Sequence, residues 1–191
     1  MQHCGSKTLT SGRLILRPLT FEDTEMMYAN WAGDAAVTKY LRWDAHRNWT
    51  VTAEYLNEVA KQYQKPDFYD WGICVRDTGI LIGNISIARA EKEPPQAWKT
   101  VKGELLGEAW EPGYVVGRKW QERGYATEAL CTVRDFWFST VGGSWLACYH
   151  ADDNVASSAV MQKAGFVYDH DAVLHRHDGT PVHCRAYYLN K

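Results

Sequence analysis

A basic, glycine-containing loop between an apolar run and an amphipathic helix constrains this chain more than any other stretch. The run Tyr114-Val115-Val116 is typical of a strand, and Gly117–Gly124 follows it directly. Apolar residues then recur at the spacing of one helical face, at Ala126, Ala129, Leu130, Val133 and Trp137. This order of strand, loop and helix start predicts a ligand site, because the first helical turn has amide groups without partners and a partial positive charge.

The chemistry of the loop favours an anion, above all a phosphate, at the helix start. Gly124 lets the backbone turn tightly and approach a ligand, and Arg118, Lys119 and Arg123 add positive charge around the turn. An ordinary connection with solvated charges is the alternative for a lone Gly-x-Ala. The loop is neither a Walker A loop nor a dinucleotide fingerprint, because Gly-Lys-Ser/Thr and the three-glycine spacing are both missing.

The pattern Gln121-x-x-Gly124-x-Ala126 resembles the pyrophosphate loop of the GCN5-related N-acetyltransferases, the GNAT family. The run Gly113-Tyr114-Val115-Val116 and the opening Arg13–Leu19 are similar to the RimJ/RimL type, which acetylates ribosomal-protein N-termini. The resemblance covers Arg13 to Leu189 and is weakest across Glu91–Leu106. It implies acetyl-CoA as cosubstrate and the GNAT fold. That fold is of the α/β (α+β) class, with a mixed, mostly antiparallel central sheet of about six to seven strands, splayed at the middle and flanked by about four helices.

Length and composition are consistent with one globular domain, 1–191, and the extent of the resemblance implies that its core spans about 13–189. The net charge of −2 argues against a nucleic-acid-coating protein, and no apolar run approaches the roughly 18 residues of a membrane span. Five widely spaced cysteines, none in C-x-x-C, indicate reduced thiols and a cytoplasmic protein. We expect no nucleic acid and no membrane as partners, and a monomer or a homodimer.

Periodicity and turn residues predict the order of the elements. Thr20 and Asp23 form a capping-box pattern, and Gly165 with Phe166 fits a Schellman helix end. The polar stretch Glu91–Leu106 is interpreted as a long loop. Strands are expected at Arg13–Leu19, Trp71–Arg76, Ile80–Ala88, Trp110–Val116, Trp145–His150, Phe166–Leu174 and Val182–Leu189, and helices at Phe21–Trp31, Val51–Gln64, Thr127–Ser139 and Val155–Ala164.

The resemblance also implies which residues bind acetyl-CoA. Backbone groups of the loop would hold the diphosphate, the strand before it would pair with the pantetheine arm, and the Val116 N–H would stabilise the oxyanion. Plain sheet packing is the alternative for the two valines, and a helix cap is the alternative for Asn154. The candidate cofactor-binding residues are Val115, Val116, Arg118, Gln121, Arg123, Gly124, Tyr125, Ala126, Thr127 and Asn154.

Acetyl transfer to an amine requires a base for the amine and a proton donor for the leaving thiolate. Ser157, in an Asn-x-x-Ser segment like that of the family, is the predicted donor, because Met161 stands where many relatives carry a tyrosine. Glu111, at the start of the central strand, is the predicted base, and Pro112 beside it departs from the usual apolar residue. Rival bases are Glu108, His150 and Asp152, and a solvated glutamate is the plain alternative for Glu111.

The acceptor side is less defined by the sequence. Trp43 is the candidate for an aromatic acceptor wall, together with Trp31 and Trp49, although packing is the plainer interpretation of each. His175-x-His177 lacks an evident third ligand, so we expect a polar hairpin face and no metal. Cys131 and Cys148 favour packing over a covalent nucleophile.

The predicted function is direct acetyl transfer in a ternary complex, to a protein N-terminus or to a small amine such as a metabolite or antibiotic. A CoA-binding sensor or interaction module without catalysis, and an unrelated nucleotide-binding domain, are the alternatives from other classes.

Overall fold

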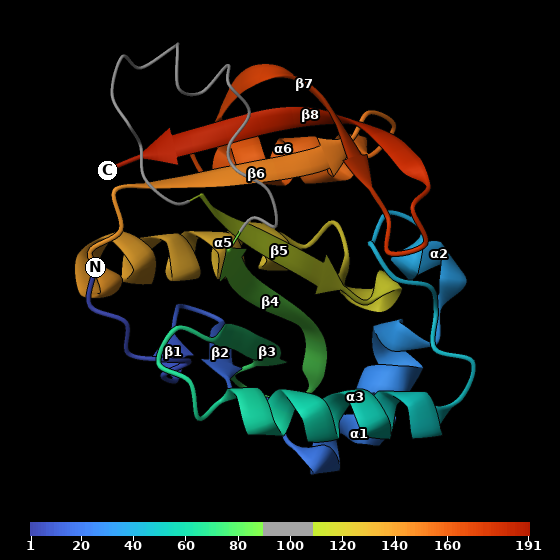
Figure 1. Ribbon diagram of the computed structural model, residues 1–191. Helices are drawn as coiled ribbons and strands as arrows, with labels where there is room; N and C mark the ends of the chain where they lie inside the picture. The colour runs from blue at the N-terminus through green and yellow to red at the C-terminus, as the bar shows by residue number, and fades with distance from the viewer. Residues whose placement is uncertain (90–108) are drawn as a thin grey trace.

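The computed structural model describes residues 1–89 and 109–191. Its strands form two sheets, and every strand pair within them is antiparallel (Figure 1). The five-stranded sheet has the order β1-β2-β3-β4-β5 and consists of β1 (Leu9–Thr10), β2 (Leu14–Arg17), β3 (Tyr69–Val75), β4 (Leu81–Arg89) and β5 (Trp110–Val116). The three-stranded sheet has the order β6-β8-β7 and consists of β6 (Trp145–Ala151), β7 (Val167–His175) and β8 (Pro181–Asn190).

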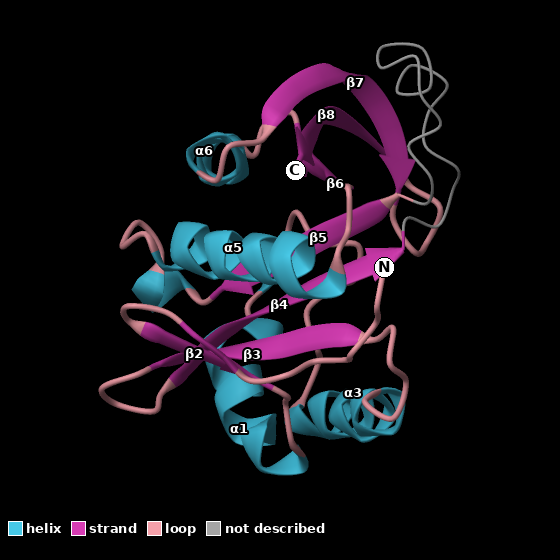
Figure 2. Cartoon of the chain, turned by 90° about the vertical axis from the view of Figure 1, so that its left-hand side faces the viewer, coloured by secondary structure: helices cyan, strands magenta, loops and turns pink. Residues whose placement is uncertain are grey.

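Helices cover both faces of the five-stranded sheet. In Figure 2, α5 (Tyr125–Phe136) lies on one face, and α1 (Thr24–Met27) and α3 (Trp49–Gln62) lie on the other. The short α2 (Ala35–Thr38) follows α1, and α6 (Val155–Lys163) packs near α5 and β6. Further helical turns are η1 (Phe21–Asp23), η2 (Tyr28–Ala32), η3 (Arg118–Trp120) and η4 (Trp137–Val141), of which η2 and η4 are π-helical.

The two sheets meet at β5 and β6, which are neighbours without a backbone ladder between them. The Cys148 thiol on β6 donates to the Pro112 carbonyl over 3.4 Å, so this carbonyl faces β6. The N–H and C=O of one strand residue point to the same edge, so the donor that Pro112 lacks would also have faced β6. Pro112 therefore leaves the β4–β5 ladder intact and weakens pairing on the β6 side. The expected splay of the sheet is confirmed.

The predicted fold class is confirmed, with two refinements. The described residues hold eight strands in two sheets, where about six to seven in one mixed sheet were expected. The crossover from β5 through α5 to β6 places two strands side by side without the parallel ladder that a mixed sheet would need. The predicted loop over Glu91–Leu106 lies outside the described residues.

Local signals act as expected at both ends of the chain. The Thr20 amide donates to the Asp23 carboxylate over 2.8 Å, which completes the capping box. At the end of α6, Gly165 has φ +92°, and the amides of Gly165 and Phe166 donate to the carbonyls of Gln162 and Met161 over 3.0 Å each. This is the Schellman arrangement, and it lets Phe166 fold into the core.

The main core lies between α5 and the five-stranded sheet and extends to β6 and α6. A second cluster, on the other face of the sheet, contains Trp31, Leu56 and Val115. Packing is thus the confirmed interpretation for Trp31, whereas Trp49 is 57% exposed.

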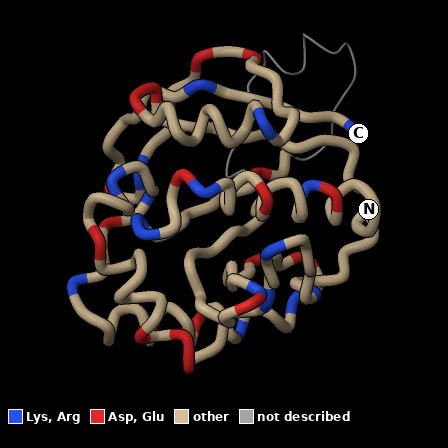
Figure 3. Tube along the Cα trace, turned by 180° about the vertical axis from the view of Figure 1, so that it is seen from behind, with Lys and Arg blue, Asp and Glu red and all other residues tan. Residues whose placement is uncertain are grey.

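In the described part of the chain, no helix is both long and apolar enough to cross a bilayer. Figure 3 shows acidic and basic residues interspersed along the chain, in keeping with the small net charge.

Candidate active site

The loop before α5 has the backbone geometry of an anion site. Gly124 adopts φ +79° as the N-cap of α5, and Glu122 has φ +61°, a left-handed conformation that residues with a side chain rarely adopt. The first helical bond runs from the Glu128 amide to the Gly124 carbonyl over 3.0 Å. The amides of Tyr125, Ala126 and Thr127 precede this first helical donor, so no carbonyl of the helix accepts from them and a ligand can meet them.

Side-chain hydrogen bonds fix this loop to the neighbouring segments. The Gln121 Nε2 donates to the Val116 carbonyl over 2.9 Å, so the end of β5 and the loop are tied together. The Arg13 Nη1 donates to the Arg123 carbonyl over 3.0 Å, and the guanidinium lies 4.6 Å from the centre of the Tyr125 ring. These contacts hold the loop in one conformation, which a ligand-binding turn requires.

Arg118 has a different placement from the one that a phosphate contact would need. Its Nη2 donates to both carboxylate oxygens of Asp34, one of them at 2.6 Å. The hydrogen bonds from Arg118 lower the pKa of Asp34, although burial opposes the shift. Asp34 also caps α2 by accepting from the Ala36 amide over 2.9 Å, so Arg118 links the loop to the start of α2.

The backbone register of the sheet places the candidate residues on two faces of β5. Glu111 pairs with Ala88 and Val115 pairs with Asn84, so the side chains of these residues share one face with Ser86. Tyr114 and Val116 point to the opposite face, toward α5 and α6. β5 is the edge strand of its sheet, so residues on both of its faces border the space beside β6.

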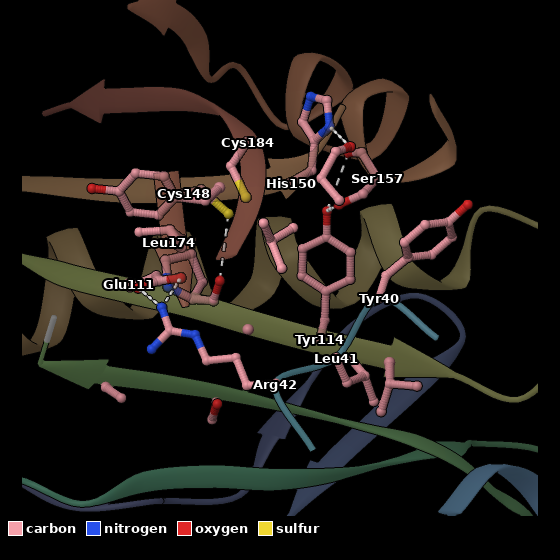
Figure 4. Close-up of a pocket in the computed structure, with 18 of the residues that line it drawn as sticks. Tyr40, Leu41, Arg42, Glu111, Tyr114, Cys148, His150, Ser157, Leu174 and Cys184 are labelled. Carbon is pink, nitrogen blue, oxygen red and sulfur yellow. Dashed lines mark hydrogen bonds and ion pairs between the residues drawn. The ribbon is translucent and has the colours of Figure 1, made fainter. Parts of the chain in front are cut away.

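A cavity of about 350 Å³ surrounds this edge (Figure 4). Its walls come from β4, β5, β6, α6, the segment before α3, and the β7–β8 hairpin. Glu111, Ser157, Trp43 and Val115 all line it, so the structure brings together the predicted catalytic, acceptor and strand residues. The rival His150 also lines it, whereas the rival Glu108 lies outside the described residues.

Glu111 is held by an arginine that sequence reasoning missed. The Arg42 Nη2 lies 3.2 Å from the Glu111 Oε2, and the two side chains are 34% and 19% exposed. The charge of Glu111 contributes, after burial, to raising the pKa of Tyr149 on β6. The carboxylate thus faces the space between β5 and β6. The pairing joins residues 69 positions apart, and no local pattern signals it.

Ser157 is held by a tyrosine that was quoted in the motif but given no role. The Tyr114 hydroxyl lies 2.8 Å from the Ser157 Oγ and 3.2 Å from its carbonyl oxygen (Figure 4). The Ser157 amide donates to the Asn154 Oδ1 over 3.2 Å, so Asn154 acts as the N-cap of α6. Met161, one turn further along, is 1% exposed and belongs to the main core.

The segment 39–44 and the β7–β8 hairpin close one end of the cavity. The Arg176 Nη1 donates to the Lys39 carbonyl over 3.1 Å, and its Nη2 lies 2.5 Å from the Asp44 Oδ1. The His177 amide donates to the Arg42 carbonyl over 3.2 Å. Trp43 lines this closed end, and its ring is tilted by 36° against the His46 ring, with ring centroids 5.0 Å apart. We call these two connected segments the strap.

Cysteines and histidines in the cavity do not form a separate reactive centre. Cys148 is 1% exposed, and burial raises the pKa of its thiol, which favours packing over nucleophilic attack. His175 and His177 line the cavity at the end of β7. Within residues 1–89 and 109–191, no three His, Cys, Asp or Glu side chains gather in a way that could hold a metal ion.

Comparison with known proteins gives a consistent result. The model of the acetyltransferase (GNAT) domain family matches residues 13–167. The chain is 28% identical over 186 residues to the uncharacterized N-acetyltransferase YoaA of Bacillus subtilis, with 96% of each chain covered.

Solved structures with 13% and 16% identity share its fold. The ribosomal-protein-S5-alanine acetyltransferase of Vibrio fischeri superposes with a TM-score of 0.74 at 13% identity, covering 97% of both chains. The microcin C7 self immunity acetyltransferase MccE, in complex with acetyl-CoA and AMP, superposes with a TM-score of 0.71 at 16% identity, covering 95% of this chain and 94% of MccE.

Proposed function

Since the chain belongs to the GNAT acetyltransferase family, we propose that it moves the acetyl group of acetyl-CoA to a primary amine by direct attack in a ternary complex. The observation that carries the proposal is the left-handed Gly124 at the start of α5, next to the edge of β5 that opens toward β6. A helix start with exposed amides binds a diphosphate, and the open strand edge offers backbone groups to the pantetheine arm.

The cofactor would be held along one continuous path. Amides from Arg123 to Thr127 bind the diphosphate, and Gln121 keeps the loop at the end of β5. The pantetheine arm then follows Val115 and Val116 into the gap between the sheets, toward Asn154. Arg118 contributes by fixing the loop against Asp34, which is a positioning role.

The proposed base and the proposed proton donor act from opposite faces of β5. Glu111 accepts the amine proton on one face, directly or through water, and Ser157 donates to the sulfur from the other. The Val116 N–H stabilises the carbonyl oxygen as it gains charge. After the transfer, Glu111 releases the amine proton to solvent and Ser157 regains a proton from solvent, so the net change is one proton moved from the amine to the CoA sulfur.

The shape of the cavity supports two candidate classes of acceptor. The strap narrows one end, where Trp43 and Arg42 lie, so the cavity accepts the end of an extended chain or a small amine. The fold shared with a ribosomal-protein acetyltransferase supports a protein N-terminus as the first candidate. A small-molecule amine is the second candidate, because a cavity of about 350 Å³ is large enough to hold a small amine.

The test combines binding and turnover. Calorimetry with CoA, ATP and NAD should give heat with CoA alone, and acetyl-CoA-dependent thiol release should occur with one class of a panel. The panel contains peptides with free N-termini, the same peptides with blocked N-termini, and small amines. If the protein binds CoA but releases no thiol with any amine of the panel, it is a CoA-binding module and the catalytic proposal is overturned.

A further inference from the structure

The contact between Tyr114 and Ser157 joins the two elements that border the gap between the sheets. Tyr114 lies on β5, and Ser157 lies in the first turn of α6. Figure 4 shows the phenol reaching from β5 across the cavity to the serine. Both residues line the cavity, so a ligand in the gap would meet them together.

The proton positions at this contact are limited by chemistry. The Ser157 carbonyl can only accept, whereas the two hydroxyls can each donate and accept. With Tyr114 donating to the carbonyl over 3.2 Å, the Ser157 hydroxyl is the group that can donate across the 2.8 Å contact to the phenol oxygen. When a thiolate appears beside Ser157, the serine proton turns to the sulfur and the phenol proton turns to the Ser157 Oγ.

We propose that Tyr114 is a positioning residue that holds the Ser157 hydroxyl in the orientation needed to donate to the sulfur of acetyl-CoA. This inference rests on the proposed function. The phenol reaches the serine from the strand, whereas Met161, one turn further along α6, has no group that can donate. Burial, and then the neighbouring Cys148, raise the pKa of Tyr114 above its usual value, so the phenol keeps its proton and remains a donor.

Tyr114→Phe, Ser157→Ala and the double variant test this role with the best amine found. We expect Tyr114→Phe to lower kcat about tenfold, as for the loss of one hydrogen bond, with the KM for acetyl-CoA changed less than about twofold. In the Ser157→Ala background, Tyr114→Phe should change kcat by less than about twofold, since the group it orients is gone. Calorimetry with CoA checks that each variant retains the folded cofactor site.

A second tyrosine contact with the same helix provides a matched control. The Tyr187 hydroxyl is 3.1 Å from the Ser158 Oγ, which is another tyrosine–serine contact on α6, and Tyr187 does not line the cavity. Tyr187→Phe should leave kcat unchanged. Equal losses in Tyr114→Phe and Tyr187→Phe would assign both contacts to the stability of α6 and overturn the positioning role.

The outcomes separate this inference from the proposed function. An active wild type with an equally active Tyr114→Phe variant overturns the inference alone. If Tyr114→Phe lowers kcat as much in the Ser157→Ala background as in the wild type, the inference is overturned as well. A wild type that releases no thiol with any amine overturns the proposed function and the inference together.

Discussion

The Arg13 Nε donates to the Glu128 Oε2 over 2.7 Å, and this contact ties β2 to the first turn of α5. Glu128 also accepts from the Ser11 hydroxyl and from the Arg13 amide, each over 2.7 Å. Burial would raise the pKa of Glu128, but these hydrogen bonds outweigh it and the pKa is lowered. The carboxylate thus stabilises the helix start at neutral pH and loses this effect as the pH falls through its folded-state pKa.

Glu128→Gln should therefore lower the melting temperature by a few degrees at pH 7 and weaken CoA binding several-fold. The amide keeps the shape but cannot form the ion pair, and the loop loses part of its anchor. Differential scanning calorimetry and CoA titration measure the two effects. Glu54→Gln, at an exposed position of α3, is the control that should change neither.

Gly124→Val should abolish CoA binding at concentrations where the wild type is saturated. The left-handed φ of +79° strains any side chain, and a Cβ at this position would lie 3.4 Å from the Arg13 guanidinium that supports the loop. Gly79→Val is a matched control, because Gly79 has φ +68° and open space around it. If the control variant loses CoA binding equally, the effect belongs to general destabilisation and not to the loop.

Glu111→Gln should lower kcat/KM about 100-fold, the lower range for loss of a general base. The amide keeps a hydrogen bond to Arg42, so the CoA dissociation constant should change little. Asp152→Asn, at the exposed rival carboxylate near Arg185, serves as the control and should retain activity. The reverse result, with Asp152 required and Glu111 dispensable, would move the base to the other candidate.

Asp70→Asn should change how stability depends on pH. Asp70 is buried on β3 near the Tyr55 hydroxyl and the Asn84 amide, at 3.4 and 3.3 Å, and burial raises its pKa to about 6. The folded state then binds more protons than the unfolded state between pH 4 and pH 6, so wild-type stability falls as the pH rises through this range. The cost at pH 7 is about 3 kcal/mol.

Urea unfolding from pH 4 to pH 7 measures this effect. The stability of Asp70→Asn relative to the wild type should grow with pH across this range, and then stay constant. Asp77→Asn, at the exposed turn between β3 and β4, should leave the pH dependence unchanged. Parallel curves for wild type and Asp70→Asn would mean that Asp70 is ionised without a penalty.

Local patterns predicted most elements because their signals lie within a few residues of one another. The apolar period of α5, Gly124 before it and Gly165 after α6 each fix a boundary from neighbouring residues. The two-residue β1 and the four-residue α2 escaped prediction, because so few residues have no period to detect. Their formation depends on the neighbours β2 and η2.

The site was predictable only in part for a similar reason. Gly124, Gln121 and Ser157 belong to short motifs, whereas the partners of the catalytic candidates come from distant segments. Tyr114 and Ser157 are 43 positions apart, and Arg42 and Glu111 are 69 apart. These pairings depend on which strands and helices become neighbours, and a single sequence does not record that.

The proposed diphosphate loop and the strap come from separate parts of the chain. The loop comprises residues 117–127 and does not line the cavity, whereas the strap, 39–44 with the β7–β8 hairpin, closes one end of it. A change in these two outer segments leaves the helix start of α5 intact. In the proposed function the strap borders the recipient and the helix start holds the donor, so new sequences in two short outer segments change the recipient while the donor stays the same.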